Sequence, residues 1–338
     1  VSIGSYLYAS TKGALMVQAV VNDKGSDAAL RAVLTELKRV QKYGFTPTEF
    51  ERAFAEYKSN LEKHYKNRAT DKNALYAQTY IDNFINNNPI VGIDYIYPKI
   101  KDMPGNVALI NQYVQQAILT DKNLVVLSMC PDKPGVTMPT VAQLQKDIDD
   151  VAASKVEAYV DDTVTEPLMS ELPKPGKTKK VTENKALGYT KLVLSNGATV
   201  LLKPTKFKDD EIRMTAVSEG GVSLYPGKDY PNASMAADVI SSTGLGKFKL
   251  TDLQKMMSGK QATVTPYISD YTEGMNGTST PKDLETMMQL VYLNFTQPRQ
   301  DRAAFDNIKK SYLDQVKNLV YDPQYIFQDS LVRNLYGH

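Results

Sequence analysis

The stretch 192-LVLSNGATVLL-202 decides how the second half of the chain folds. Two runs of β-branched and apolar residues flank Asn196-Gly197, and an Asn-Gly pair readily adopts the positive φ angles of a tight hairpin turn. The stretch therefore predicts two strands joined by a hairpin. Residues 212–217 predict a third strand, which is broken at Gly220-Gly221.

Helices are expected on both sides of this hairpin. Downstream, Thr251 with Gln254 predicts the cap of a helix that carries Leu253, Met256 and Met257. Upstream, residues 6–9 and 14–21 are strand-like, and a turn follows at 22–25. Further helices and one more strand are predicted by apolar periodicity and capping signals: a helix ending at Gly44, one that starts at the capping box Thr46–Glu49 and runs toward Lys66, an Asn-rich break at 86–89, a helix at 105–119, a buried strand at 124–129, and a helix from the Thr140 and Gln143 cap to Tyr159.

Residues 161–188 differ in character from both flanks. They contain several prolines and lysines, a composition that solvates well, resists packing and stays semi-extended. A lysine-rich anion site is a sharper interpretation of the same residues. We expect a connector whose hinge candidates are Pro167, Pro173, Pro175 and Gly176.

The two halves resemble each other. Phe45-Thr46 follows one amphipathic helix and precedes Phe50 and Tyr57 on the next, and Phe295-Thr296 likewise precedes Phe305 and Tyr312 with the same spacing of the paired aromatics. Chance similarity of amphipathic helix pairs is the alternative. The pattern predicts an α+β fold of two related α/β sandwich modules, each an antiparallel or mixed sheet covered by helices, over residues 1–160 and 189–338, joined by the 161–188 linker.

Composition excludes several classes of function. Forty Lys and Arg against 38 Asp and Glu leave a net charge of +2 on 338 residues, too little for a nucleic-acid surface. The single cysteine, Cys130, can form no internal disulfide and is expected to be buried. No apolar run approaches the roughly 20 residues that span a bilayer. An opening on Val1 without a signal pattern suggests the interior of a longer protein.

No catalytic motif is convincing. The two histidines, His64 and His338, belong to different modules, and His64 is expected on a solvated helix face rather than at a metal. The glycines of 243-TGLGKF-248 lack the remaining residues of a phosphate loop and predict a helix-ending turn. The acidic cluster Asp147, Asp149 and Asp150 is expected on a solvated helix face.

The hairpin at 192–202, followed by 217-VSEGG-221, by 242-STG-244 and by Phe248, resembles the opening of a repeat of the pitrilysin/insulinase family of zinc peptidases. This resemblance implies that residues 1–160 are similar to the second domain of such a protein, 161–188 to the connector between its halves, and 189–338 to a third domain that lacks its last strands. The first and fourth domains would lie outside this sequence.

Active members of that family carry an inverted zinc motif, H-x-x-E-H, followed by a distal glutamate. The resemblance places Ala233, Ala236 and Ala237 at the motif positions, and the distal glutamate falls near Tyr312 and Asp314. It therefore implies no catalytic residue and no metal in this segment, with zinc expected in the intact parent.

The function implied is that of a non-catalytic scaffold and chamber wall in a metalloendopeptidase that degrades or processes peptides. The alternatives are a segment of an inactive homologue that serves as a structural or regulatory partner subunit, and a peptide-binding module that uses exposed sheet edges. Peptide is the expected substrate of the parent, and a homologous partner subunit is possible. Family analogy suggests the periplasm or cell envelope of a bacterium.

Overall fold

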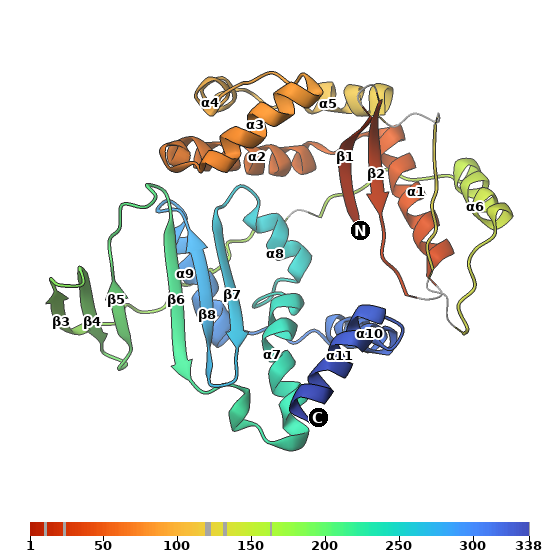
Figure 1. Cartoon of the computed structure of the whole chain (residues 1–338). Helices are drawn as coiled ribbons and strands as arrows, with labels where there is room; N and C mark the ends of the chain where they lie inside the picture. The colour runs from red at the N-terminus through yellow and green to blue at the C-terminus, as the bar shows by residue number, and fades with distance from the viewer. Residues whose placement is uncertain (10–11, 23–24, 119–122, 131–133, 163, 338) are drawn as a thin grey trace. The chain divides into compact units, whose positions relative to one another are not determined.

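The computed structural model describes residues 1–9, 12–22, 25–118, 123–130, 134–162 and 164–337. It combines helices with small antiparallel sheets, as Figure 1 shows, so the α+β class predicted from the sequence is confirmed. Two compact units form: one from 1–52, 104–162 and 301–338, the other from 53–103 and 163–300. None of the described helices is long and apolar enough to cross a membrane.

The first unit combines a hairpin with several helices. Strands β1 (Ser2–Ala9) and β2 (Lys12–Gln18) pair antiparallel. The helices are α1 (Ser26–Tyr43), α5 (Val107–Tyr113) with a π-helical continuation (Val114–Ile118), α6 (Val141–Ala153), α10 (Arg302–Leu319) and α11 (Pro323–Tyr336). Helix α1 ends where predicted, because Gly44 takes a φ of +74° and its N–H still bonds to the Val40 carbonyl.

The second unit contains two three-stranded sheets. Their strands are β3 (Thr178–Asn184), β4 (Tyr189–Leu194) and β5 (Thr199–Leu202) in the order β3-β4-β5, and β6 (Ile212–Glu219), β7 (Ala262–Ile268) and β8 (Thr272–Ser279) in the order β6-β8-β7. The helices are α2 (Pro47–Asn67, whose start lies in the first unit), α3 (Asn73–Asn86), α4 (Ile93–Ile100), α7 (Tyr230–Thr243), α8 (Leu250–Met257) and α9 (Leu284–Thr296), with short 3-10 turns at Arg68–Thr70, Val222–Leu224 and Gly227–Asp229.

The core of the second unit lies where α9 packs on β7 and β8. Met287 of α9 is only 1% exposed, and Leu245, Leu290 and Leu293 form a buried cluster. Burial of this apolar surface is the main favourable contribution to folding. Leu168 and Met169 of the proline-rich segment pack against the same cluster.

The same order of elements occurs twice along the chain. A hairpin followed by three helices is seen as β1, β2, α1, α2, α3 and again as β7, β8, α9, α10, α11. The paired aromatics lie on the second helix of each run, Phe50 and Tyr57 on α2 and Phe305 and Tyr312 on α10. The division into modules 1–160, 161–188 and 189–338 stays a prediction, because the two compact units each combine segments from several of these ranges.

Two predicted elements and the predicted burial of one residue are wrong. Residues 124–129 form no strand, since none of the strands in the described part of the chain pairs with them. The side chains of Leu127 and Met129 are 84% and 87% exposed, and Cys130 is half-buried rather than buried. Helix α6 ends at Ala153 instead of Tyr159, because Ser154 adopts an extended backbone.

Two further details differ from expectation. Thr251 does not cap α8, because that helix already begins at Leu250 and its N-cap residue is Lys249, which makes no side-chain cap hydrogen bond. Strand β3 forms inside the predicted linker, paired antiparallel with β4. The 192–202 hairpin is confirmed, although within its turn Gly197 takes a φ of +91° while Asn196 keeps a negative one. The turn predicted at 22–25 includes residues 23–24, which lie outside the described residues.

Candidate functional site

Helix α7 carries the three alanines that the family resemblance places at the zinc-motif positions. Ala233, Ala236 and Ala237 are spaced i, i+3 and i+4, so they share one face of the helix. Ala233 is buried, the other two are half-buried, and α7 packs against β7. Methyl groups cannot bind a metal or carry a proton. These residues therefore do not fit a zinc ion, and the helix face serves packing.

Metal-binding side chains do not gather in the part of the chain that the structure describes: no group of three or more His, Cys, Asp or Glu could hold an ion there. His64 lies partly exposed on α2 with Nε2 3.1 Å from Asp71 Oδ2. Asp314 is half-buried on α10, which belongs to the first unit, whereas α7 belongs to the second. His338 lies outside the described residues.

The acidic cluster on α6 is not simply a solvated face, which corrects the expectation. Asp147 is buried, and its Oδ1 lies 2.6 Å from Arg31 Nη2 of α1. Asp150 accepts hydrogen bonds from Lys146 at 2.7 Å and from Arg31 at 2.6 Å. These two bonds hold the pKa of the Asp150 carboxyl below its ordinary value. Asp149 accepts a bond from Gln145. The cluster thus joins α6 to α1.

The glycine-containing loop after α7 is the helix-ending turn that was predicted. Gly244 takes a φ of +89°, and a Cβ there would lie 2.3 Å from the Phe248 carbonyl oxygen, so only glycine fits. The N–H groups of Leu245, Gly246 and Phe248 all donate to carbonyls within the protein. A phosphate cradle needs such N–H groups free, and here they are occupied.

The proline-rich segment is tied to the second unit, which corrects the expectation that it resists packing. Pro167, Pro173, Pro175 and Gly176 lie in irregular backbone ahead of β3. Near its start Glu166 pairs with Lys247, and Leu168 and Met169 join the buried cluster. Near its end the Lys177 N–H donates to Ser195 Oγ at 3.2 Å. Its role as a hinge stays a prediction.

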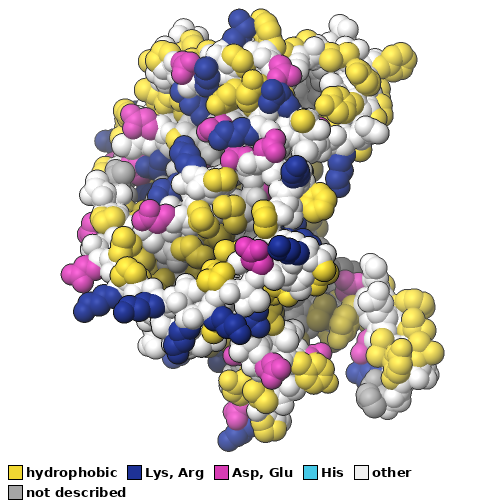
Figure 2. All heavy atoms as spheres, turned by 90° about the vertical axis from the view of Figure 1, so that its left-hand side faces the viewer, with side chains coloured by type: hydrophobic (Ala, Val, Ile, Leu, Met, Phe, Trp, Pro, Cys, Tyr) yellow, Lys and Arg dark blue, Asp and Glu magenta, His cyan; other side chains and the backbone are white. Residues whose placement is uncertain are grey.

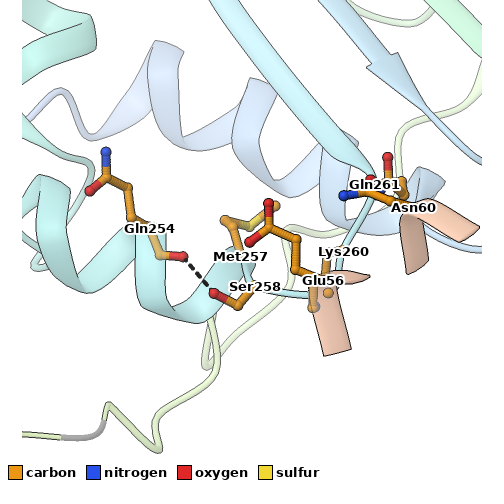
Figure 3. A pocket seen from close by; sticks show the side chains of 8 residues that line it. Glu56, Asn60, Gln254, Met257, Ser258, Lys260 and Gln261 are labelled. Carbon is orange, nitrogen blue, oxygen red and sulfur yellow. Dashed lines mark hydrogen bonds between the residues drawn. The ribbon is translucent and has the colours of Figure 1, made fainter. Parts of the chain in front are cut away.

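A shallow hollow of about 390 Å³ lies between α2 and the segment that joins α8 to β7 (Figure 3). Gln261 Nε2 donates to Asn60 Oδ1 at 2.8 Å beside it, across 201 residues of sequence. The lining residues are Glu56, Asn60, Gln254, Met257, Ser258, Gly259, Lys260 and Gln261. Sequence reasoning missed this site because its polar residues carry no motif and meet only through the fold.

The surface shows no dominant charge on the face that Figure 2 presents. Lys and Arg side chains are interspersed with Asp and Glu and with hydrophobic side chains. This distribution agrees with the net charge of +2.

Comparison with known proteins finds relatives by sequence and neighbours by structure. No family model matches the chain. The chain is 26% identical over 306 residues to a "Zinc protease PQQL-like" of Arabidopsis thaliana, which covers 89% of this chain and 29% of the relative. It is also 26% identical over 140 residues to "Probable zinc protease PqqL" of Haemophilus influenzae, covering 41% of this chain and 15% of the relative. The chain thus spans less than a third of either relative.

Among solved structures, the chain is similar to a variant of the ferredoxin protease FusC in complex with Arabidopsis ferredoxin. The TM-score is 0.56 at 18% identity, over 98% of this chain and 37% of that one. This likeness concerns the fold alone.

The α+β fold accords with the likeness to relatives named as zinc proteases, and the chain spans less than a third of the length of those relatives. These relatives support the resemblance to the pitrilysin/insulinase family, and the chain is similar to a part of such a protein.

Proposed function

We propose that the chain is a non-catalytic scaffold and chamber-wall segment of a longer zinc-dependent metalloendopeptidase that degrades or processes peptides. The observation that carries the proposal is the face of α7, where the positions of the zinc motif hold Ala233, Ala236 and Ala237. The relatives named as zinc proteases support the class of the whole protein.

Peptide hydrolysis in such a protein depends on zinc held by residues outside this chain. The side chains of this segment contribute shape. Paired halves joined by a connector can admit an extended peptide and exclude bulky folded proteins, so selection depends on size and on strand-like docking. The two sheets of the second unit offer edge strands, including β6 and β7, for that kind of docking.

The test compares two proteins in one assay: the 338-residue chain, and a parent of the length of the relatives. An unstructured fluorogenic peptide is the substrate, with and without a zinc chelator. We expect chelator-sensitive hydrolysis by the parent and none by the chain alone. Hydrolysis by the chain alone would overturn the scaffold role. A zinc-free, inactive parent that still binds the peptide would favour the inactive partner or peptide-binding alternative.

The periplasm or envelope is our proposal for the location of the parent. It rests on family analogy and on the likeness to "Probable zinc protease PqqL" of Escherichia coli, whose crystal structure is described as that of a periplasmic protease. Fractionation of cells with an antibody against this chain tests it. A purely cytoplasmic signal would contradict it.

A further inference from the structure

Helix α2 contacts residues that lie far from it in the sequence. Residues 53–67 of this helix belong to the second compact unit, together with the β6-β8-β7 sheet. Figure 1 shows α2 beside the ends of these strands. Asn60 Oδ1 accepts from Gln261 Nε2 at 2.8 Å, and Lys63 Nζ donates to Gln261 Oε1 at 3.4 Å. One side-chain amide is therefore bonded at both ends by residues i and i+3 of the same helix.

A second contact lies further along the same helix. Lys66 Nζ is 3.5 Å from Asp210 Oδ2, and the Asp210 side chain is buried. Asp210 comes two residues before β6 begins, as Gln261 comes one residue before β7. At the other end of the contact, Ala55 lies so close to Gly259 that a Cβ on this glycine would be 3.0 Å from the Ala55 Cβ. The helix thus meets the starts of both edge strands.

The chemistry of these contacts differs from that of the core. They join polar groups, and Asn60 and Lys66 remain exposed to solvent, whereas α9 meets the sheet through buried Met287 and Leu290. An open hollow lies directly beside Gln261. Each hydrogen bond of this kind changes a folding equilibrium by a factor of only about five. Small, solvent-exposed polar contacts are the kind that open without global unfolding.

We propose that Asn60, Lys63 and Lys66 on α2, with Gln261 and Asp210 beside the strands, form a releasable clasp between the helix and the sheet. The helix lies in the range predicted as one module, 1–160, and the sheet in the range predicted as the next, 189–338. The idea that this clasp helps to open and close a peptide chamber rests on the proposed function. The contact itself does not, and it can be measured without any activity.

Hydrogen exchange of the 338-residue chain, followed by mass spectrometry, tests the clasp. In the unchanged chain, we expect amides of residues 53–67 to exchange faster than those of β8, because a releasable helix opens before the sheet unfolds. Gln261→Ala removes both the bond to Asn60 and the bond from Lys63, so it should speed exchange of 53–67 a further fivefold or more, about fivefold being the factor for one lost hydrogen bond. Asn60→Ala removes only the first of these bonds and should speed exchange about fivefold, and the double variant should add little to the effect of Gln261→Ala.

Gln254→Ala is the matched control. Gln254 lines the same hollow, and its described hydrogen bond, from Ser258, goes to its backbone carbonyl rather than to its side chain. This variant should leave exchange of 53–67 unchanged. Equal protection of 53–67 and β8 in the unchanged chain would overturn the proposal, as would an effect of Gln254→Ala equal to that of Gln261→Ala. If Gln261→Ala unfolds the sheet, Asn60→Ala still gives the decisive readout, because it alters no residue of the sheet. Failure of zinc-dependent hydrolysis in the parent would change none of these results.

Discussion

At the scale of single residues, the centre of the β6-β8-β7 sheet leaves no room for a side chain at Gly274. A Cβ there would lie 1.9 Å from the Ala216 carbonyl oxygen on the neighbouring strand. Because the obstacle is backbone in a paired strand, it cannot move without breaking the ladder. Glycine is required here by close approach of the strands rather than by a special φ angle.

Gly274→Ala should lower the free energy of unfolding by about 2 kcal/mol or more, through overpacking of a close-packed interior. Urea unfolding followed by circular dichroism measures it. Gly92→Ala is the control, since nothing lies within 4 Å of a Cβ at that position. Equal stability of the two variants would contradict the sheet pairing described here.

Asp150 gives the chain a pH-dependent contact at the same scale. Its pKa in the folded chain is lowered by hydrogen bonds from Lys146 and then Arg31, from an ordinary value of 3.8. A carboxyl with a depressed pKa stabilises the fold fully above its ordinary pKa, and that contribution is lost as pH falls through the lower, folded value. Asp150→Asn should therefore be less stable than the unchanged chain at pH 7, and the difference should shrink in strong acid. Urea titrations at several pH values measure the difference, and one that stays constant with pH would argue against the ion pairs.

At the scale of helices and strands, two threonines with the same sequence signature differ in whether they cap a helix. Thr140 and Gln143 form a reciprocal capping box at the start of α6, whereas Thr251 lies inside the first turn of α8 and bonds no helix N–H. The sequence alone predicts a cap at both, because both are followed three residues later by glutamine.

Thr140→Ala should cost about 1 kcal/mol of stability, the usual loss for a missing N-cap. Thr251→Ala should change stability by less than about 0.5 kcal/mol, as an exposed substitution. Thermal unfolding of both variants under one set of conditions provides the comparison. A larger loss for Thr251→Ala would mean that α8 begins elsewhere.

Features fixed by near neighbours in sequence could be predicted. The capping box of Thr46 and Glu49, the ends of α1 at Gly44 and of α7 at Gly244, and the hairpin around Gly197 each depend on residues within a few positions. Elements that depend on a distant partner could not. The composition of residues 178–184 predicts a solvated linker, but these residues form a strand because β4 pairs with them. The composition of residues 124–129 predicts a strand, but no strand in the described part of the chain pairs with them.

The same reason governs the candidate site. The placing of the α7 alanines at the motif positions rests on the resemblance, which fixes their spacing from Thr243, and it stays a prediction. Burial of Asp147 beside Arg31 and the bond between Gln261 and Asn60 could not be predicted from the sequence, because each joins residues more than a hundred positions apart.

At the scale of the whole molecule, the repeated order of hairpin and three helices and the short share of each relative's length fit a piece of a modular chain. The central claim concerns what that piece lacks. If Ala233, Ala236 and Ala237 mark a metal-free copy of the catalytic module, the chain should fold without zinc.

The most direct test is the zinc content of the purified 338-residue chain after equilibration with micromolar zinc and removal of loosely bound ions, measured by elemental mass spectrometry. The account predicts far less than one zinc per chain and a melting temperature unchanged by a chelator. One tightly held zinc per chain, lost together with stability when the chelator is added, would contradict it.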